Sequence, residues 1–171
     1  MERKSLRWFR RKKTDESESR PNEASFESSN EDNAAQSTLV SLTNPVQAFT
    51  KRLELMIKDP EIASKTKALK DTRIQLIIGG EPLLLSKKGV QPLSLTFERS
   101  TQSDVFIRIS ETAAGQLAMT SNLTEFKKEY KELVTSKDAT SFVSIKLHTQ
   151  LTELRNQGYF SVELLRILID A

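Results

Sequence analysis

The chain has 171 residues, which suffices for one globular domain and a tail, and it contains no cysteine. Disulfide frameworks and thiolate metal sites are therefore excluded, and an intracellular, cytoplasmic protein is favoured. The formal net charge of +3 does not favour a nucleic-acid binder. No run of about 18 apolar residues predicts a membrane span, and the N-terminus lacks the apolar core of a secretory signal.

The charge is divided into two blocks at the N-terminus. Residues 1–13 carry a side-chain balance of +6, whereas residues 14–38 carry −6 and are rich in Ser, Asn, Asp and Glu. Apolar residues are too few here to repay the entropy of ordering the backbone. We therefore predict a disordered tail over residues 1–38 and a single domain over residues 39–171.

The basic tip of this tail mixes cations with aromatic residues. Such a segment can lie on an anionic bilayer, where each cation contributes on the order of 1 kcal/mol. The alternatives are a solubilising tail and a tail that contacts nucleic acid, and the acidic block can fold back and mask the tip. The residues predicted to bind the membrane surface are Arg3, Lys4, Arg7, Trp8, Phe9, Arg10, Arg11, Lys12 and Lys13.

The domain is predicted to begin with two helices. Asn44 followed by Pro45 is a helix-start signature, and apolar residues recur at helical spacing as far as Ile57. Asp59-Pro60 interrupts this helix, because a residue before proline is pushed out of the helical region. A second, short helix is predicted between Pro60 and Lys70.

Four strand-like segments follow, each alternating apolar and polar residues or bounded by turn signals. They cover residues 73–78, 82–86, 93–97 and 105–109. Their links are short, and a parallel pair needs a long crossover, so we predict that these strands pair largely antiparallel.

The second half of the chain returns to helices. Ser110 and Asn122 are predicted to cap an Ala-rich helix and a longer charged helix, and residues 143–147 alternate as a fifth strand. A short helix ends at Gly158, and Ser161 is predicted to cap the last helix. This order indicates an α+β fold in which helices cover a five-stranded, mostly antiparallel sheet.

Candidate chemistry is sparse. His148 is the only histidine and falls on a polar strand face, so neither a metal site nor a catalytic role is expected. Gly79-Gly80 lacks the context of a phosphate loop, and no nucleophile–base pair stands out. We therefore predict no enzyme activity and no cofactor. The remaining signal is an excess of apolar helix surface, which suits ordinary core, a lipid tunnel or a dimer face.

The stretch DVFIRISETAAGQL, within Ser103–Leu117, resembles a segment of the sterol carrier protein 2 family. In that family an Asp-Val-x-Ile-x-Ile strand runs through Ser-x-x into a helix, and the similarity extends over roughly residues 45–168. The resemblance implies a five-stranded sheet with helices around an apolar tunnel, and lipid binding without chemistry.

The resemblance also implies which residues face the apolar cavity, although each of them also suits plain core packing. The residues are Phe106, Leu117, Phe126, Phe142, Leu151, Tyr159, Phe160, Leu164 and Leu168. The function predicted is non-catalytic binding of a lipid or other apolar ligand, with peripheral membrane association through the basic tip. The alternative is a protein–protein interaction module, as a homodimer or with another partner, that has a filled core and no ligand.

Overall fold

The structure is a computed structural model that describes residues 44–170, so both charge blocks of the predicted tail lie outside the described residues. The helices are α2 (Pro45–Ile57), α3 (Pro60–Thr66), α4 (Glu111–Ala118), α5 (Leu123–Thr135), α6 (Leu151–Gln157) and α7 (Glu163–Ile169). The strands are β1 (Thr72–Ile78), β2 (Glu81–Lys87), β3 (Ser94–Thr96), β4 (Val105–Ile109) and β5 (Val143–Leu147). A single 3₁₀ turn, Tyr159–Ser161, precedes α7.

The strands form one five-stranded sheet in the order β3-β2-β1-β4-β5, which confirms the predicted α+β class. The pairs β1–β2, β2–β3 and β4–β5 are antiparallel. The central pair β1–β4 is parallel, with Leu76 opposite Ile107. The sheet is therefore mixed. Short links do not forbid this parallel pair, because β2 and β3 themselves make up the crossover between its two strands.

The chain crosses the sheet between β3 and β4, in a segment over residues 97–104 that we call the crossing loop. Gln75 of β1 is 1 % exposed and holds this loop with its side-chain amide. Its Oε1 accepts a hydrogen bond from the Ser100 N–H at 2.6 Å, and its Nε2 donates to the carbonyls of Glu98 at 3.3 Å and Leu83 at 3.1 Å. A buried amide with partners on both ends fixes the loop against β1 and β2.

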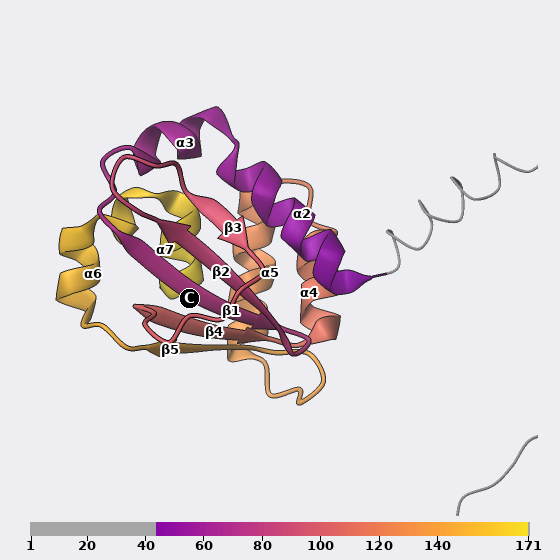
Figure 1. Ribbon diagram of the computed structural model, residues 1–171. Helices are drawn as coiled ribbons and strands as arrows, with labels where there is room; N and C mark the ends of the chain where they lie inside the picture. Colours follow the sequence, from indigo (N-terminus) through magenta and orange to yellow (C-terminus); the bar gives the residue numbers. More distant parts are fainter. Residues whose placement is uncertain (1–43, 171) are drawn as a thin grey trace, which may run out of the picture.

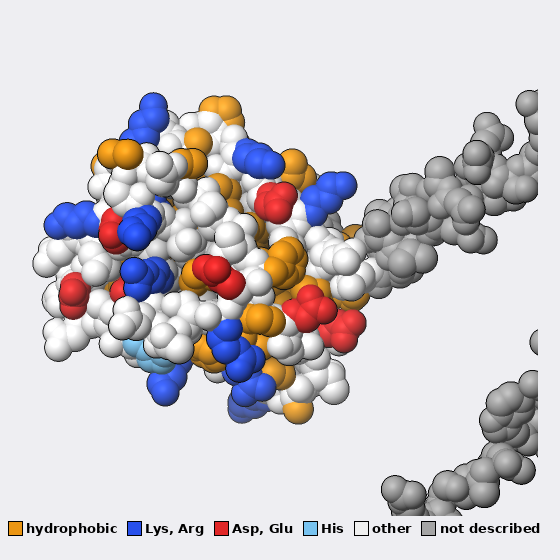
Figure 2. Space-filling model, viewed as in Figure 1, with side chains coloured by type: hydrophobic (Ala, Val, Ile, Leu, Met, Phe, Trp, Pro, Cys, Tyr) orange, Lys and Arg blue, Asp and Glu red, His pale blue; other side chains and the backbone are white. Residues whose placement is uncertain are grey.

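The hydrophobic core lies between one face of the sheet and the helices. Figure 1 shows α5 and α7 behind the strands, with α2 and α4 along one side and α6 near the opposite side. The inner face presents fully buried side chains such as Leu76 and Ile107, and Phe49 of α2 stacks on Phe126 of α5 with ring centroids 6.3 Å apart. Within residues 44–170 no helix covers the other face, which Figure 2 shows as a mixture of apolar, basic and acidic side chains.

The helix starts follow the predicted caps, with one exception. The side chains of Asn44, Ser110 and Asn122 accept hydrogen bonds from backbone N–H groups at the starts of α2, α4 and α5. The predicted cap Ser161 is wrong: it belongs to the 3₁₀ turn, and α7 starts after Val162 without a side-chain cap. Because α7 is largely buried, packing rather than capping stabilises it.

Candidate functional site

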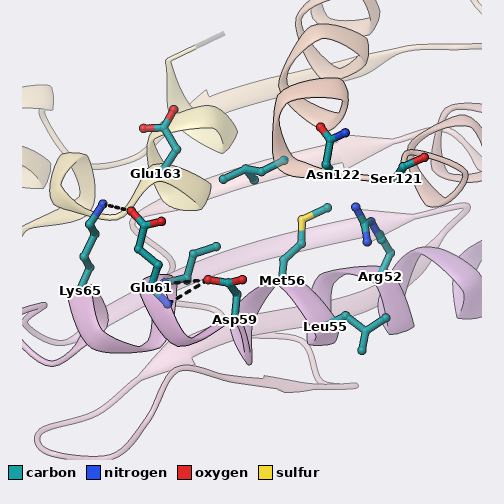
Figure 3. Close-up of a pocket in the computed structure, with 11 residues that line it drawn as sticks. Arg52, Leu55, Met56, Asp59, Glu61, Lys65, Ser121, Asn122 and Glu163 are labelled. Carbon is teal, nitrogen blue, oxygen red and sulfur yellow. Dashed lines mark hydrogen bonds and ion pairs between the residues drawn. The ribbon is translucent and has the colours of Figure 1, made fainter.

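A groove opens among the helices, between α2 and α3 on one side and the starts of α5 and α7 on the other (Figure 3). We call it the helical groove; it has a volume of about 540 Å³ and is partly open to solvent. Four apolar side chains line it, from Leu55, Met56, Ile62 and Leu123. Leu55 is 57 % exposed, whereas Met56 and Ile62 are buried, so the apolar lining runs from the surface into the interior.

Two sets of helix caps position the walls of the helical groove. Pro60 starts α3, and the Asp59 side chain accepts hydrogen bonds from two backbone N–H groups of its first turn. On the opposite wall, Asn122 Oδ1 accepts from the Glu125 N–H at 2.9 Å, and Glu125 Oε2 accepts from the Ser121 N–H at 2.8 Å. These reciprocal caps hold the start of α5 where it borders the groove.

Two of the three acidic side chains that line the helical groove, Glu61 and Glu163, are paired with basic ones, and the third, Asp59, caps α3. Lys65 Nζ lies 2.7 Å from Glu61 Oε1. Glu163 accepts from Arg166 at 2.6 Å and lies 3.5 Å from Lys127. Partial burial pushes the pKa of Glu163 upward, but the Arg166 and Lys127 cations outweigh it and hold the pKa below its usual range.

Arg52 of α2 is the basic residue of the groove that lacks such a partner. Within residues 44–170 it forms no ion pair within 4.0 Å, and its buried Nε has no hydrogen-bond acceptor. A buried donor without an acceptor costs about 1–3 kcal/mol. The Ser121 N–H is the main cause that lowers the pKa of Glu125, and the Arg52 charge is a smaller cause of the same sign. The guanidinium therefore lies near the start of α5 without being neutralised there.

Five of the nine residues predicted to face an apolar cavity lie together in the core. Each has no measurable exposure, and all belong to the continuous cluster between the sheet and the helices: Leu117, Phe126, Tyr159, Leu164 and Leu168. Phe126 also stacks on Tyr130, with ring centroids 5.8 Å apart. Phe126 lies one turn after Leu123 on α5, so this part of the core continues from the apolar lining of the helical groove.

The other four predicted residues lie apart from this group. Phe106 lies on the uncovered face of the sheet, half-buried, and stacks on His148 at 6.3 Å between ring centroids. Leu151, the first residue of α6, is 51 % exposed. Phe142 is half-buried just before β5, and Phe160 packs between the core and the Arg155 guanidinium.

A second polar cluster joins β4 to the C-terminal segment. Asp104 accepts hydrogen bonds from the Tyr159 hydroxyl at 2.7 Å and from the Arg73 N–H at 2.9 Å. His148 Nδ1 lies 3.1 Å from the Ser103 carbonyl oxygen and 3.3 Å from Ser103 Oγ. A bond to the carbonyl requires the hydrogen to be on Nδ1, so this nitrogen is not a base toward the serine hydroxyl. These hydrogen bonds join the segment just before β4 to β1, to the end of β5 and to the C-terminal segment.

The sequence did not single out the residues of the helical groove. Met56 and Leu123 fall on the buried stripes predicted for their helices, but a stripe does not show that two helices diverge at one end. One residue of the groove, Arg52, can be recognised from its position in the sequence. It stands three residues after Phe49 and four before Met56, so an arginine occupies the buried edge of an otherwise apolar face.

The described range contains neither a metal-ligand cluster nor a membrane-spanning helix. Between residues 44 and 170, no three side chains of His, Asp or Glu come together as metal ligands would. In the same range, no helix combines the length and the apolar character that crossing a bilayer requires.

Comparisons with known proteins give a likeness to solved structures. No family model matches the chain, and no curated protein matches it. The solved structure of a protein called "UbiJ-SCP2 Ubiquinone synthesis protein" is similar, with 10 % sequence identity and a TM-score of 0.37. The match covers 82 % of this chain and 97 % of that chain. The name of that protein includes the family that the Ser103–Leu117 motif indicates. The description of the fold rests on the strand order and the packing given above and not on this likeness.

Proposed function

We propose that this protein binds an amphipathic lipid or another ligand with an apolar chain, without chemistry, in the helical groove. The observation that carries the proposal is the apolar lining, which continues from exposed Leu55 to buried Met56 and Ile62. The rim is polar, with two acids, Glu61 and Glu163, already paired. An apolar slot with a polar rim suits a ligand that has one end of each kind.

The size of the helical groove is adequate for such a ligand. A volume of about 540 Å³ lies within the range of roughly 300–1,000 Å³ typical of small-molecule sites. Burying one methylene gains about 0.8 kcal/mol, so ten of them would gain about 8 kcal/mol before ordering costs. A net gain of this size would give roughly micromolar binding, and the costs of association and ordering make the expected affinity weaker.

We propose that the buried residues Leu117, Phe126, Tyr159, Leu164 and Leu168, none of which lines the helical groove itself, form an inner wall behind it. The sequence resemblance places them on a tunnel between sheet and helices, and Phe126 supports this because it adjoins the groove through Leu123. A ligand chain longer than the groove reaches them by displacing the Phe49–Phe126 stack. Phe106 and Leu151 belong to a different surface of the domain and are not part of this wall.

The experiment that tests the proposal is a titration of the full-length protein with a fluorescent fatty acid. Leu123→Arg places a long charged side chain in the groove, and we expect it to weaken binding at least tenfold. Val90→Arg is the matched control, because Val90 is 98 % exposed and does not line the groove. Equal binding by both variants and the wild type would refute the site, and no binding by the wild type would refute the function.

A second candidate function is a protein–protein interaction module. The observation that favours it is the uncovered face of the sheet, where Phe106 is half-buried and the crossing loop holds Phe97 at 62 % exposure. Native mass spectrometry with organic extraction separates the two functions. A monomer with a copurified lipid supports the carrier, whereas a ligand-free mass that doubles with concentration supports a homodimer.

We also propose that the basic tip, residues 1–13, guides the protein to anionic membranes. The charge and the two aromatic residues of this segment support it, and the segment lies outside the described residues. Deleting residues 1–13 is expected to abolish sedimentation with anionic vesicles while fatty-acid binding is retained. Unchanged sedimentation after the deletion would exclude the tip as an anchor.

A further inference from the structure

The helical groove contains one basic side chain whose position is unusual. Arg52 points from α2 toward the start of α5, where Ser121 and Asn122 lie (Figure 3). The N-terminus of a helix carries a partial positive charge, so a cation is unfavourable there and an anion is favourable. The chain thus places Arg52 and the N-terminus of α5 together at one end of the groove, beside the Glu125 carboxylate that caps the Ser121 N–H.

Within residues 44–170, no other charged group forms an ion pair with Arg52. Asp59 is occupied as the cap of α3, Glu61 pairs with Lys65, and Glu163 pairs with Arg166 and Lys127. The Arg52 charge helps to lower the pKa of Glu125, but Glu125 Oε2 already accepts a hydrogen bond from the Ser121 N–H at 2.8 Å.

The geometry of the guanidinium identifies what is missing. Arg52 Nε is buried and has no acceptor within residues 44–170. A guanidinium presents its N–H groups as a planar fork that matches the two oxygens of a carboxylate or of a phosphate. An acceptor of this kind, arriving with a ligand, would neutralise the charge, and it would also satisfy Nε once the side chain turns to expose this atom to the groove.

We propose that Arg52 binds the anionic headgroup of an amphiphile whose apolar chain lies along Met56 and Leu123. This inference rests on the proposed function, because it assigns the polar end of the same ligand. The ligand class is an amphiphile with a single acidic headgroup, a carboxylate or a phosphate monoester. The start of α5 contributes the field of its backbone N–H groups.

The test compares three ligands that share a twelve-carbon chain: dodecanoate, dodecyl phosphate and dodecanol. Isothermal titration calorimetry is run on full-length wild type, Arg52→Gln, Arg52→Lys and the control Arg155→Gln. Arg155 covers Phe160 on a different part of the surface. We expect the wild type to bind at least one of the two anions roughly tenfold more tightly than dodecanol, the effect of one charged hydrogen-bonded contact. The better of the two anions identifies the headgroup as carboxylate or phosphate.

Arg52→Gln is expected to bind that anion no more tightly than dodecanol while dodecanol affinity stays unchanged. Arg52→Lys should fall between, and Arg155→Gln should match the wild type. Equal affinity of the wild type for all three ligands would overturn the inference and leave the proposed function standing. An absence of binding for all three would overturn both. If Arg52→Gln does not fold, two measurements still test the inference. One is the preference of the wild type for an anion over dodecanol, and the other is the weaker anion binding expected of Arg52→Lys, which lacks the guanidinium fork.

Discussion

The crossing loop and the helical groove both place a polar side chain against apolar surface, and they treat it in opposite ways. Under the crossing loop, Gln75 finds backbone partners for both ends of its amide. In the helical groove, Arg52 Nε is buried with no acceptor in the described part of the chain. A satisfied buried group stabilises one structure, whereas an unsatisfied one needs an explanation, which for Arg52 we propose is a bound ligand.

We expect the largest effect on stability at Gln75, the buried side chain whose amide has hydrogen-bond partners at both ends. Gln75→Leu removes the amide that holds the crossing loop and leaves the Ser100 N–H and the Glu98 carbonyl without it. We expect a loss of about 3 kcal/mol in the free energy of unfolding and unchanged fatty-acid affinity. Urea titration measures the loss. Gln91→Leu, an exposed site, is the matched control, and an equal small effect at both sites would contradict the role of Gln75.

Alkaline pH should act on the two buried tyrosines. Burial raises the pKa of Tyr130, and burial together with the Asp104 hydrogen bond raises that of Tyr159. Above about pH 10 the unfolded chain loses these protons while the folded chain keeps them. The unfolding free energy therefore falls as pH rises, by about 1.4 kcal/mol per pH unit for each tyrosine. Tyrosinate absorbance that appears before unfolding would contradict this.

Tyr159→Phe isolates one of these groups. The substitution removes the hydroxyl that donates to Asp104 at 2.7 Å, and the carboxylate keeps the Arg73 N–H. We expect a loss of about 2 kcal/mol at neutral pH, since bonds to charged groups contribute about 1.5–3 kcal/mol. The slope above pH 10 should be halved. A variant as stable as the wild type would show that Asp104 does not need this donor.

Arg52→Leu tests directly whether Arg52, whose Nε has no acceptor in the described range, serves ligand binding and not stability. The substitution keeps an apolar stem on the buried edge of α2 and removes a donor without an acceptor. We expect stability to stay equal or to rise by up to about 1 kcal/mol, while binding of an acidic amphiphile is lost. Thermal unfolding and calorimetry measure the two quantities on one sample. A marked destabilisation would mean that Arg52 is structural, and the comparison with Gln75 would fail.

Glu125→Gln should have the smallest effect. Glutamine keeps an acceptor for the Ser121 N–H but removes the negative charge that interacts with the Arg52 cation. We expect affinity for the acidic amphiphile to rise about two- to threefold, because solvent screens an exposed charge pair and leaves it a small contribution. Dodecanol affinity serves as the control, and a parallel rise there would rule out an electrostatic cause.

Local signals in the sequence were enough to predict most elements of the fold. Asn44-Pro45, Ser110 and Asn122 carry their own helix-cap chemistry, and strands such as Val105–Ile109 carry their own alternation. The parallel β1–β4 pair was missed because strand periodicity does not show which strands are neighbours. Ser161 was misassigned because the tertiary packing of α7, rather than a cap, decides where that helix begins.

The candidate site was less predictable for a related reason. Burial of residues such as Leu117 and Phe126 follows from periodicity, but Phe106 was placed with them although its strand face is the uncovered one. A groove exists only where two helices diverge, which depends on contacts between residues far apart in sequence. Arg52 was visible as an exception on an apolar stripe, yet only the three-dimensional structure shows that its Nε has no acceptor in the described range.

The position of α7 in the chain has a consequence for how the domain is made. This helix contributes Leu164, Leu165 and Leu168 to the core, and Tyr159 just before it donates to Asp104. Ribosomes synthesise the N-terminal elements first, at roughly 5–20 residues per second, so the sheet emerges before the helix that closes it. Until α7 leaves the exit tunnel, the inner face of β1 and β4 has no complete cover. Folding of this domain is therefore completed only after the synthesis of α7.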